Sequence, residues 1–257
     1  MISNSAIIED GAKIGKNVKI GANVFISKDS KIGDNCEILQ GACIYGNTTL
    51  GKNCKVFSYA VIGSQPQDLK YNEEEVELVI GDNNVIREFC LFNPGTKGGG
   101  SKTLIGDNNF FMGYVHIAHD CIIGNGVIFA NGVTLAGHVE VGDYVVIGGM
   151  TPIHQFVKIG EHAMIAGASA VSQDIPPYCL AQGNRAVLKG LNLVGLRRRF
   201  GREKIDILKK AYKELFLNKK PLKEVALKLY EKSEDEFIKN LAKFVLETKR
   251  GIPLERG

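Results

Sequence analysis

A six-residue period runs through most of this chain and limits the folds that it can adopt. From Ile105 to Val171 every sixth residue is large and apolar, which makes twelve such positions without a break. A second series of eleven runs in one register from Ile2 to Ile62. A period of six fits neither an α-helix nor an alternating β-strand, whereas a hexapeptide repeat is typical of a parallel β-helix.

The period also predicts how each coil is built. Three six-residue faces give a coil of about 18 residues, so residues one coil apart should stack at about 4.8 Å, the spacing of hydrogen-bonded strands. The residue four after each large apolar one should also point inward, and it is small or slim at nearly every repeat. Asn109 is the exception in the later series, and stacked asparagines can hydrogen-bond to one another. We expect tight corners at the glycines that follow an apolar residue, namely Gly15, Gly21, Gly33, Gly51 and Gly63.

Two interruptions of the repeat predict loops that leave the wall of the solenoid. Residues 64–79 carry polar and acidic side chains that cannot fill inward positions, and the register resumes at Ile80, one regular coil length after Ile62. We therefore expect one coil to depart from the wall as a loop. A second loop, at about residues 93–104, shifts the phase by one before Ile105. Loops on a rigid scaffold often carry binding residues.

After Val171 the repeat stops, and an irregular connector contains Pro176, Pro177 and Gly183. Apolar spacings of three and four then predict helices over about 205–216, after Pro221 and from about Glu234. We expect a β-helical domain over residues 1–190 and a small helical domain over 191–257. The tail is basic, which fits either a solvated helical face or a site for phosphate or an acidic partner. Its cations are Arg197–Arg199, Arg202, Lys209, Lys210, Lys213, Lys219, Lys220 and Lys223.

Composition and charge exclude several classes of protein. No apolar run approaches the roughly 18 residues of a transmembrane helix, and the amino terminus lacks the pattern of a secretory signal. We therefore expect a cytoplasmic protein without stable membrane insertion. The net charge of +4 is too small to indicate a nucleic-acid partner. Four of the six cysteines fall on inward positions, so we interpret them as buried slim hydrophobes rather than disulfides or zinc ligands: Cys36, Cys54, Cys90 and Cys121.

All five histidines lie inside the later series. The regular coil length stacks His119 over Gly137 and Gly137 over Gln155, and it places Asp120 over His138. His154 flanks the same column. His116 lies three residues from it, and His162 maps onto a different face, where we assign it to the surface without a role.

This histidine strip has three interpretations. The histidines could be satisfied surface residues, or imidazoles from stacked coils could converge on zinc. One histidine could instead act as a general base, because its pKa lies near neutrality. His119 next to Asp120 fits a base beside an orienting carboxylate, and Gly137 offers an unshielded N–H as an oxyanion donor.

Several short stretches of the repeat and its loops carry a family resemblance. They are Gln67–Tyr71, His116–Cys121, Leu135–Val139, Ile147–Thr151, His154–Phe156, Gln173–Tyr178 and Ala181–Asn184. They resemble the acyl carrier protein–UDP-N-acetylglucosamine O-acyltransferase family, and the resemblance covers essentially the whole chain. It implies a left-handed parallel β-helix, against the usual right-handed crossover rule. It also implies a homotrimer with active sites between neighbouring solenoids, and neither cofactor nor metal.

The resemblance implies a reaction as well. An (R)-3-hydroxyacyl group would pass from acyl carrier protein to the 3-position of UDP-N-acetylglucosamine, or of its 3-amino analogue, as the first step of lipid A biosynthesis. His119 would be the general base, Asp120 would orient and polarise it, and the Gly137 N–H would hold the thioester oxyanion. Gly167 would leave room for a long acyl chain. The basic helices would dock the acidic carrier protein.

The resemblance also implies a set of substrate-binding residues. The first loop would contact the sugar and diphosphate across the trimer interface through Gln67, Asp68 and Lys70. The cleft would be lined by His116, His138, His154 and Gln155. The residues near the nucleotide or acyl end would be Arg185, Asn192, Arg198 and Arg199. Three positions depart from the family's pattern: Asn93–Gly95 in place of a common basic pair, Arg185 in place of a frequent histidine, and Val194 in place of an acidic nucleotide contact.

Three alternatives compete with this interpretation. An N-acyltransferase of the same pathway would carry an extra amino-terminal uridine-binding domain, for which a repeat that starts at Ile2 leaves no room. A zinc carbonic anhydrase on the same fold would need bound metal and would not explain Gln67–Tyr71 or the helical tail. A non-enzymatic scaffold predicts that His119→Ala has no effect on function.

Overall fold

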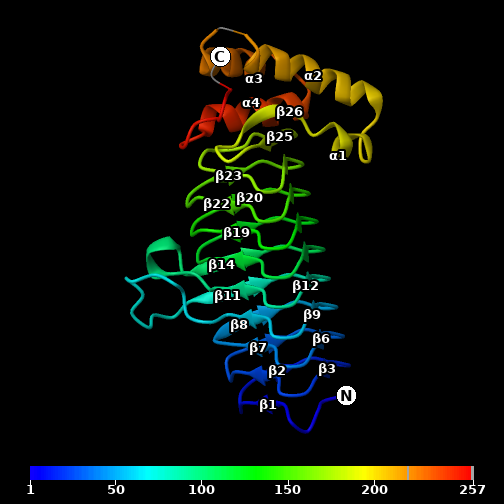
Figure 1. Ribbon diagram of the computed structural model, residues 1–257, viewed down its shortest axis with the longest axis vertical. Coiled ribbons are helices and arrows are strands. Elements are labelled where there is room, and N and C mark those ends of the chain that lie inside the picture. Colours follow the sequence, from blue (N-terminus) through cyan, green and yellow to red (C-terminus); the bar gives the residue numbers. More distant parts are fainter. Residues whose placement is uncertain (219, 256–257) are drawn as a thin grey trace.

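The computed structural model describes residues 1–218 and 220–255, so Lys219 of the basic tail lies outside the described residues. The chain climbs as a column of stacked coils from the amino terminus to a group of helices at the other end (Figure 1). The coils form a left-handed parallel β-helix with three sheets as its sides. Short strands alternate between the sheets in chain order, as the six-residue period predicts.

Each sheet is a ladder of strands from successive coils. The first sheet contains β1 (Ile7–Ile8), β4 (Phe25–Ile26), β7 (Cys43–Ile44), β10 (Val61–Ile62), β13 (Leu91–Phe92), β16 (His116–Ile117), β19 (Thr134–Leu135) and β22 (Pro152–Ile153). The second contains β2 (Lys13–Ile14), β5 (Lys31–Ile32), β8 (Asn47–Leu50), β11 (Glu77–Ile80), β14 (Lys102–Ile105), β17 (Ile122–Ile123), β20 (Glu140–Val141) and β23 (Lys158–Ile159). The third contains β3 (Lys19–Ile20), β6 (Glu37–Ile38), β9 (Lys55–Val56), β12 (Val85–Ile86), β15 (Phe110–Phe111), β18 (Ile128–Phe129), β21 (Val146–Ile147), β24 (Met164–Ile165), β25 (Cys179–Gln182) and β26 (Val187–Leu191).

Three corners connect the sheets within each coil. We call them corner 1 (first to second sheet, as at residues 118–121), corner 2 (second to third, as at 124–127) and corner 3 (third to first, as at 112–115). The predicted register is confirmed, because regular coils pair residues one coil length apart, as in Ile117 with Leu135. The large apolar residues of the series from Ile105 to Val171 are all buried. Ile2 is 49% exposed because it belongs to the terminal coil.

Both interruptions of the repeat are insertions at corner 1. Leu50 pairs with Ile80 rather than with Asp68, which a coil of regular length would place beside it. The expectation that a whole coil departs from the wall is therefore wrong, since the sheets remain continuous across the insertion. In the same way Ile80 pairs with Ile105 rather than with Gly98, so the second insertion is the shorter one. Because β11 and β14 begin at Glu77 and Lys102, the first loop spans 63–76 and the second spans 93–101.

Four of the five glycines that follow apolar residues have a different role from the one expected, whereas Gly63 adopts a positive φ of 82° at corner 1. Gly33 does not adopt a positive φ; a Cβ there would lie 2.6 Å from the carbonyl carbon of Gly51 in the next coil, so close stacking requires glycine. The left-handed turn falls two residues later, on Asn35 and Asn53 (φ 59° and 55°), and asparagine tolerates this conformation. Their side chains form a ladder, with the Asn35 amide donating to Asn53 Oδ1 at 3.2 Å.

The inward Asn109 is satisfied in another way. Its amide nitrogen donates to the carbonyls of Gly106 and Gly124, each at 3.1 Å, and its Oδ1 accepts from the Val127 N–H at 2.8 Å. Its side chain therefore bonds to backbone, whereas its own N–H donates to the side-chain Oδ1 of the stacked Asn84 at 3.0 Å. The inward cysteines are buried free thiols, as predicted, and burial raises the pKa of the Cys90 thiol to about 12.

The connector after Val171 is more regular than expected. Ile175 bridges to Ile159, β25 extends the third sheet in parallel, and β26 then pairs with β25 in the antiparallel direction. The helices follow at the end of the column: α1 (Leu193–Arg197), α2 (Arg202–Phe216), α3 (Leu222–Lys232) and α4 (Glu236–Glu247). The three longer helices match the predicted ones, whereas α1 was not predicted.

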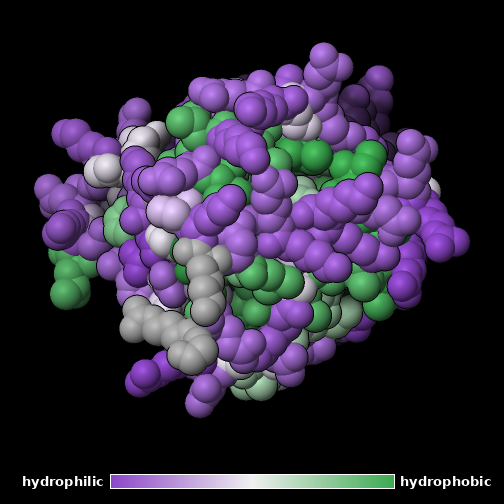
Figure 2. Space-filling model, turned by 90° about the horizontal axis from the view of Figure 1, so that it is seen from above, coloured by the Kyte–Doolittle hydropathy of each residue, from purple (hydrophilic) through white to green (hydrophobic). Residues whose placement is uncertain are grey.

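Polar contacts join the helices to the last coil. The Asn240 amide of α4 donates to Glu161 at 2.8 Å, and the Tyr178 hydroxyl donates to the same carboxylate at 2.5 Å. Seen from this end, hydrophilic side chains cover much of the surface, with hydrophobic groups between them (Figure 2). Among the described residues, no helix has the length and apolar character to cross a membrane.

Candidate active site

Corner 1 brings the predicted histidine column together. A Cβ on Gly137 would lie 2.5 Å from Cε1 and 2.8 Å from Nε2 of His119, so the imidazole lies directly against this glycine. The stacking of His119 on Gly137 is therefore confirmed. It follows from the coil length, because residues 119 and 137 occupy the same corner of successive coils.

His119 and Asp120 form a hydrogen-bonded pair. His119 Nδ1 lies 2.8 Å from Asp120 Oδ2. Because a carboxylate only accepts hydrogen bonds, Nδ1 carries the proton, and in the neutral ring the free lone pair is on Nε2. His119 remains partly exposed, whereas the Asp120 side chain is fully buried. The pair thus presents a basic nitrogen at the surface and a carboxylate below it.

The second loop closes over the Asp120 carboxylate. The Thr96 N–H donates to Oδ1 at 2.8 Å, and the Thr96 hydroxyl donates to Oδ2 at 2.6 Å. The Asp120 N–H donates to the Thr103 hydroxyl at 2.8 Å. A buried carboxylate needs such partners, since an unpaired buried charge is strongly unfavourable. Sequence reasoning missed Thr96 as a site residue, although the second break in the repeat marked its loop.

His138 and the residues above it continue the strip. The His138 ring meets that of His119 edge to face, with centroids 5.2 Å apart, and stacks on Phe156 at 4.5 Å. His138 Nε2 lies 3.8 Å from Asp120 Oδ2, beyond hydrogen-bond distance. His154 and Gln155 are exposed on the next coil. The four predicted cleft residues therefore lie on adjacent coils, with His116 on the strand before corner 1 and the other three at or beside this corner.

His116 has a distinct environment. It is half-buried on β16, and its Nδ1 lies 3.1 Å from the Leu91 carbonyl oxygen. Burial lowers the pKa of His116, and the hydrogen bond to Leu91 opposes this effect. His116 is therefore favoured in its neutral form, with Nδ1 donating to the carbonyl.

The Gly137 N–H differs from the neighbouring backbone N–H groups in its hydrogen bonding. Its neighbours Ala136 and His138 donate to the backbone of adjacent coils, but no hydrogen bond from Gly137 N–H is found within the described part of the chain. This donor can therefore bind an anionic oxygen without breaking a native contact.

The two loops at corner 1 enclose a cavity of about 480 Å³. Asp68 and Lys70 line it from the first loop, and Thr96, Lys97 and Gly98 line it from the second. Gln67, beside Asp68 on the first loop, is exposed. Asp68 and Lys70, two of the three first-loop residues predicted to bind substrate, thus share a cavity with the second loop, which contacts Asp120.

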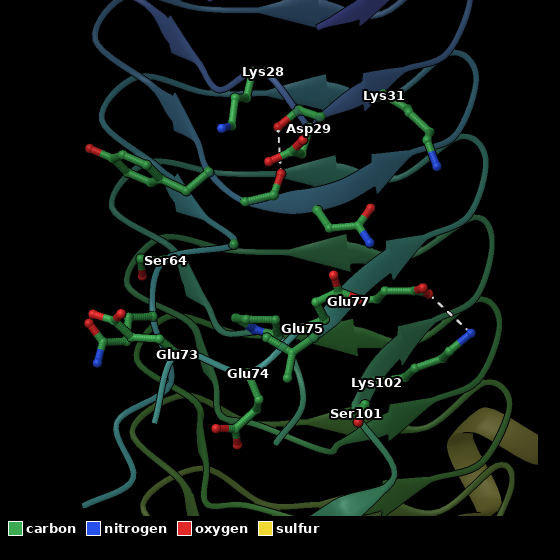
Figure 3. A pocket seen from close by; sticks show the side chains of 18 of the residues that line it. Lys28, Asp29, Lys31, Ser64, Glu73, Glu74, Glu75, Glu77, Ser101 and Lys102 are labelled. Atoms are coloured by element: carbon green, nitrogen blue, oxygen red, sulfur yellow. Dashed lines mark hydrogen bonds and ion pairs between the residues drawn. The ribbon is translucent and has the colours of Figure 1, made fainter. Parts of the chain in front are cut away.

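A larger cavity of about 930 Å³ lies on the amino-terminal side of these loops. Figure 3 shows Lys28 and Lys31 at one side and Glu73–Glu75 at the other. Glu77 and Lys102 form an ion pair of 3.0 Å at its edge. Neither His119 nor Asp120 lines this cavity.

The remaining predicted site residues lie away from corner 1. Gly167 is exposed at corner 3. The Arg199 guanidinium lies 3.9 Å from the ring centroid of Tyr144 at corner 2, and Arg185 and Arg198 are exposed. Asn192 caps α1, with its Oδ1 accepting from the Gly195 N–H at 3.0 Å and its amide donating to the His162 carbonyl at 2.9 Å.

The prediction for His162 needs correction. The ring is half-buried rather than on the surface, because Tyr144, Tyr178 and Phe200 surround it with centroids 5.0, 6.0 and 5.0 Å away. Burial lowers the pKa of His162. It therefore belongs to an aromatic column that supports the helical end.

Zinc was one interpretation of the histidine strip. His119, Asp120 and His138 each offer a ligand atom, and these atoms lie within 4.8 Å of one another. However, Asp120 Oδ2 already accepts hydrogen bonds from the Thr96 hydroxyl and from His119 Nδ1. A metal on this oxygen would compete with both bonds, so the observed contacts favour proton transfer over metal binding.

Comparisons with known proteins agree with this architecture. A family profile described as bacterial transferase hexapeptide (six repeats) matches residues 29–64 and 102–137, and one described as Udp N-acetylglucosamine O-acyltransferase, domain 2, matches residues 174–253.

Full-length relatives are similar over nearly the whole chain. The acyl-[acyl-carrier-protein]–UDP-N-acetylglucosamine O-acyltransferases of Sulfurimonas denitrificans and Aliarcobacter butzleri are 68% and 63% identical, each over 99% of this chain and 98% of its own length. A solved structure of the UDP-N-acetylglucosamine acyltransferase from Campylobacter jejuni superposes with a TM-score of 0.97 at 55% identity, covering all of both chains. The chain therefore belongs to the acyl-[acyl-carrier-protein]–UDP-N-acetylglucosamine O-acyltransferase family.

Proposed function

We propose that this protein transfers an (R)-3-hydroxyacyl group from acyl carrier protein to the 3-hydroxyl of UDP-N-acetylglucosamine, the first step of lipid A biosynthesis. The 2.8 Å hydrogen bond between His119 and Asp120 carries the proposal, because it makes a general base at an accessible corner. The similarity to full-length acyltransferases supports the substrates.

The geometry suggests how the residues divide the reaction. His119 Nε2 removes the proton from the acceptor hydroxyl as its oxygen bonds to the thioester carbonyl carbon. Asp120 stabilises the imidazolium that forms and keeps the ring oriented. The Gly137 N–H donates to the oxyanion. When the carbonyl reforms, the carbon–sulfur bond breaks, and His119 returns the proton to the leaving thiolate.

A homotrimer would complete this site. The predicted site residues lie at or against all three corners of one chain, with His119 at corner 1, Arg199 packed on Tyr144 of corner 2 and Gly167 at corner 3. A neighbouring chain could bring its own corner against the histidine strip. The outer face of the first sheet supports such contacts, because Ile7 is 62% exposed and Phe25, Val61 and Leu91 are partly exposed on it. Leu69, fully exposed on the first loop, offers another contact.

The helical end would dock the carrier protein. Arg197, Arg198 and Arg202 are exposed around the start of α2, and Lys210 and Lys213 are exposed on the same helix. This positive surface suits an acidic partner that needs rapid and specific association. We place the reaction in the cytoplasm, where reducing conditions suit the free thiols of the six cysteines.

Mass spectrometry of the reaction product tests the proposed activity. Purified protein receives a mixture of 3-hydroxyacyl carrier proteins with UDP-N-acetylglucosamine and, separately, with its 3-amino analogue. We expect an acylated UDP-sugar, whose mass gives the acyl length and whose stability to mild base separates ester from amide. The absence of acylated sugar from either acceptor would refute the function and favour a binding scaffold.

The role of His119 needs its own variant. We expect His119→Ala to lower kcat by roughly 10²–10⁴-fold, the usual contribution of a general base. The melting temperature should stay close to that of the parent, since the ring lies at an outer corner. A fully active variant would exclude His119 as the base.

Light scattering should give three times the chain mass of 28.0 kDa, and a monomer mass would refute the shared site.

A further inference from the structure

We infer that Thr96 is a positioning residue for the general base and acts through Asp120. This inference rests on the proposed function of His119. The second loop would then be a part of the proton-transfer site rather than a connection that interrupts the repeat.

Thr96 holds both oxygens of the carboxylate. Its N–H donates to Oδ1 at 2.8 Å and its hydroxyl donates to Oδ2 at 2.6 Å, and the residue is only 5% exposed. Hydrogen bonds to a charged acceptor are short and strong, especially where water is excluded. The two bonds fix the plane of the carboxylate, and the same Oδ2 then faces His119 Nδ1.

Gly99 shows how closely the loop covers Asp120. A Cβ at position 99 would lie 2.0 Å from Asp120 Cγ and 2.3 Å from each carboxylate oxygen. The short helical turn Lys97–Gly99 also folds back on Thr96, whose carbonyl accepts from the N–H groups of Gly99 and Ser101 at 2.9 and 2.8 Å. The backbone of Thr96 is therefore held in place by its own loop, and the N–H that bonds to Asp120 cannot move away without disrupting this turn.

The first loop is joined to this arrangement. The buried Asn93 amide donates to the carbonyls of Ser64 and Gln65 at 3.0 and 3.1 Å, which ties the bases of the two loops together. The Lys97 N–H also donates to Glu74 at 3.2 Å. The second loop, which contains Thr96, thus connects the loop predicted to contact substrate with the carboxylate that orients the base.

The carboxylate has a competing partner. His138 Nε2 lies only 3.8 Å from the Asp120 Oδ2 that bonds to His119. Without the Thr96 hydroxyl, rotation of the carboxylate toward His138 would lengthen its bond to His119. Loss of this hydroxyl should therefore impair the reaction step more than substrate binding.

Steady-state kinetics of three variants test the inference. Thr96→Val removes the hydroxyl and keeps both the shape and the backbone hydrogen bond. We expect kcat to fall by roughly 10- to 100-fold, as for a lost hydrogen bond to a charged group, with little change in KM. Thr96→Ser restores the hydroxyl and should recover most of the activity. Thr48→Val is the matched control, since Thr48 is also buried and its hydroxyl donates to the Tyr45 carbonyl at 2.7 Å; it should leave kcat unchanged.

Variants that also lack the Asp120 carboxylate distinguish a positioning role of Thr96 from a general structural effect of its substitution. In Asp120→Ala, Thr96→Val should cause no further loss of kcat, because its partner is already absent. Equal losses with and without Asp120, or a Thr96→Ser variant as impaired as Thr96→Val, would overturn the inference.

Nuclear magnetic resonance gives a readout that does not depend on catalysis. In protein labelled with ¹⁵N-histidine, the Nδ1 signal of His119 should shift in Thr96→Val and stay in place in Thr48→Val. An unchanged His119 signal overturns the inference whatever the activity. If the parent protein acylates no sugar while the His119 signal shifts as expected, the proposed function fails and the positioning contact stands.

Discussion

Alanine at position 137 would push directly on the His119 ring. The added Cβ would lie 2.5 Å from Cε1, 2.8 Å from Nε2 and 3.1 Å from Nδ1. Ordinary van der Waals contact begins at 3.4 Å, so the ring must move by about 1 Å. The backbone does not resist the substitution, because Gly137 does not have a positive φ. The perturbation therefore acts on one side chain.

The size of the effect follows from this displacement. A shift of about 1 Å moves Nδ1 away from Asp120, to which it is bonded at 2.8 Å, and moves Nε2 away from the acceptor. Misplacement of a reacting group by about 1 Å can cost about 10²-fold in rate. We expect Gly137→Ala to lower kcat by about 10²-fold or more, with the melting temperature nearly unchanged.

The assay is initial-rate acyl transfer to UDP-N-acetylglucosamine, with Gly201→Ala as the matched control. Gly201 also lacks a positive φ, and a Cβ there meets no atom within 4 Å. The control should keep full activity. A fully active Gly137→Ala protein, or a crystal structure of it with an unmoved His119 ring, would refute the reasoning.

Two further predictions concern the other corners. Gly167→Met should shift the preferred acyl chain to a shorter length in competition between carrier-bound chains, since its side chain would occupy the exposed corner 3; an unchanged length profile contradicts this role for Gly167. Burial lowers the pKa of His162 below its ordinary value of 6.5, so the unfolded chain binds a proton at higher pH than the folded one. His162 therefore costs no stability above about pH 6.5 and destabilises the fold as the pH falls below it. When the pH is lowered from 7.5 to 5.5, the melting temperature of His162→Phe should fall by less than that of the parent protein. Equal decreases in the two proteins would show that His162 does not contribute to the pH dependence of stability.

The sequence predicted the wall and the histidine strip for the same physical reason. In a solenoid, a constant coil length brings residues that are one coil apart in the sequence into direct contact. The sequence alone therefore predicted that His119 stacks on Gly137. The same regularity predicted buried positions from Ile105 to Val171. Helices α2, α3 and α4 followed from their apolar spacing, since each packs one face against the last coils or its neighbours.

The loops and the helical end could not be predicted in the same way. Thr96 lies in an insertion, where the period no longer fixes which residues meet, and its contact with Asp120 depends on the turn that follows it. His162 was assigned to the surface because the coil length maps it away from the histidine strip, onto the column of residues at corner 2. At the last coils, Phe200 covers that column. The strand β25 was missed because prolines precede it in the sequence.

The two insertions at corner 1 also have a consequence for evolution. Leu50 pairs with Ile80, and Ile80 with Ile105, in the same order as in coils without insertions. Residues can therefore be added to or removed from these loops without moving a residue of the sheets. Stability depends on the coils, whereas the loops hold residues that are proposed to select the substrate. Lineages of this family could change acceptor preference by altering the length of the first loop, while the second loop keeps Thr96 on Asp120 and the coils that carry His119 stay the same.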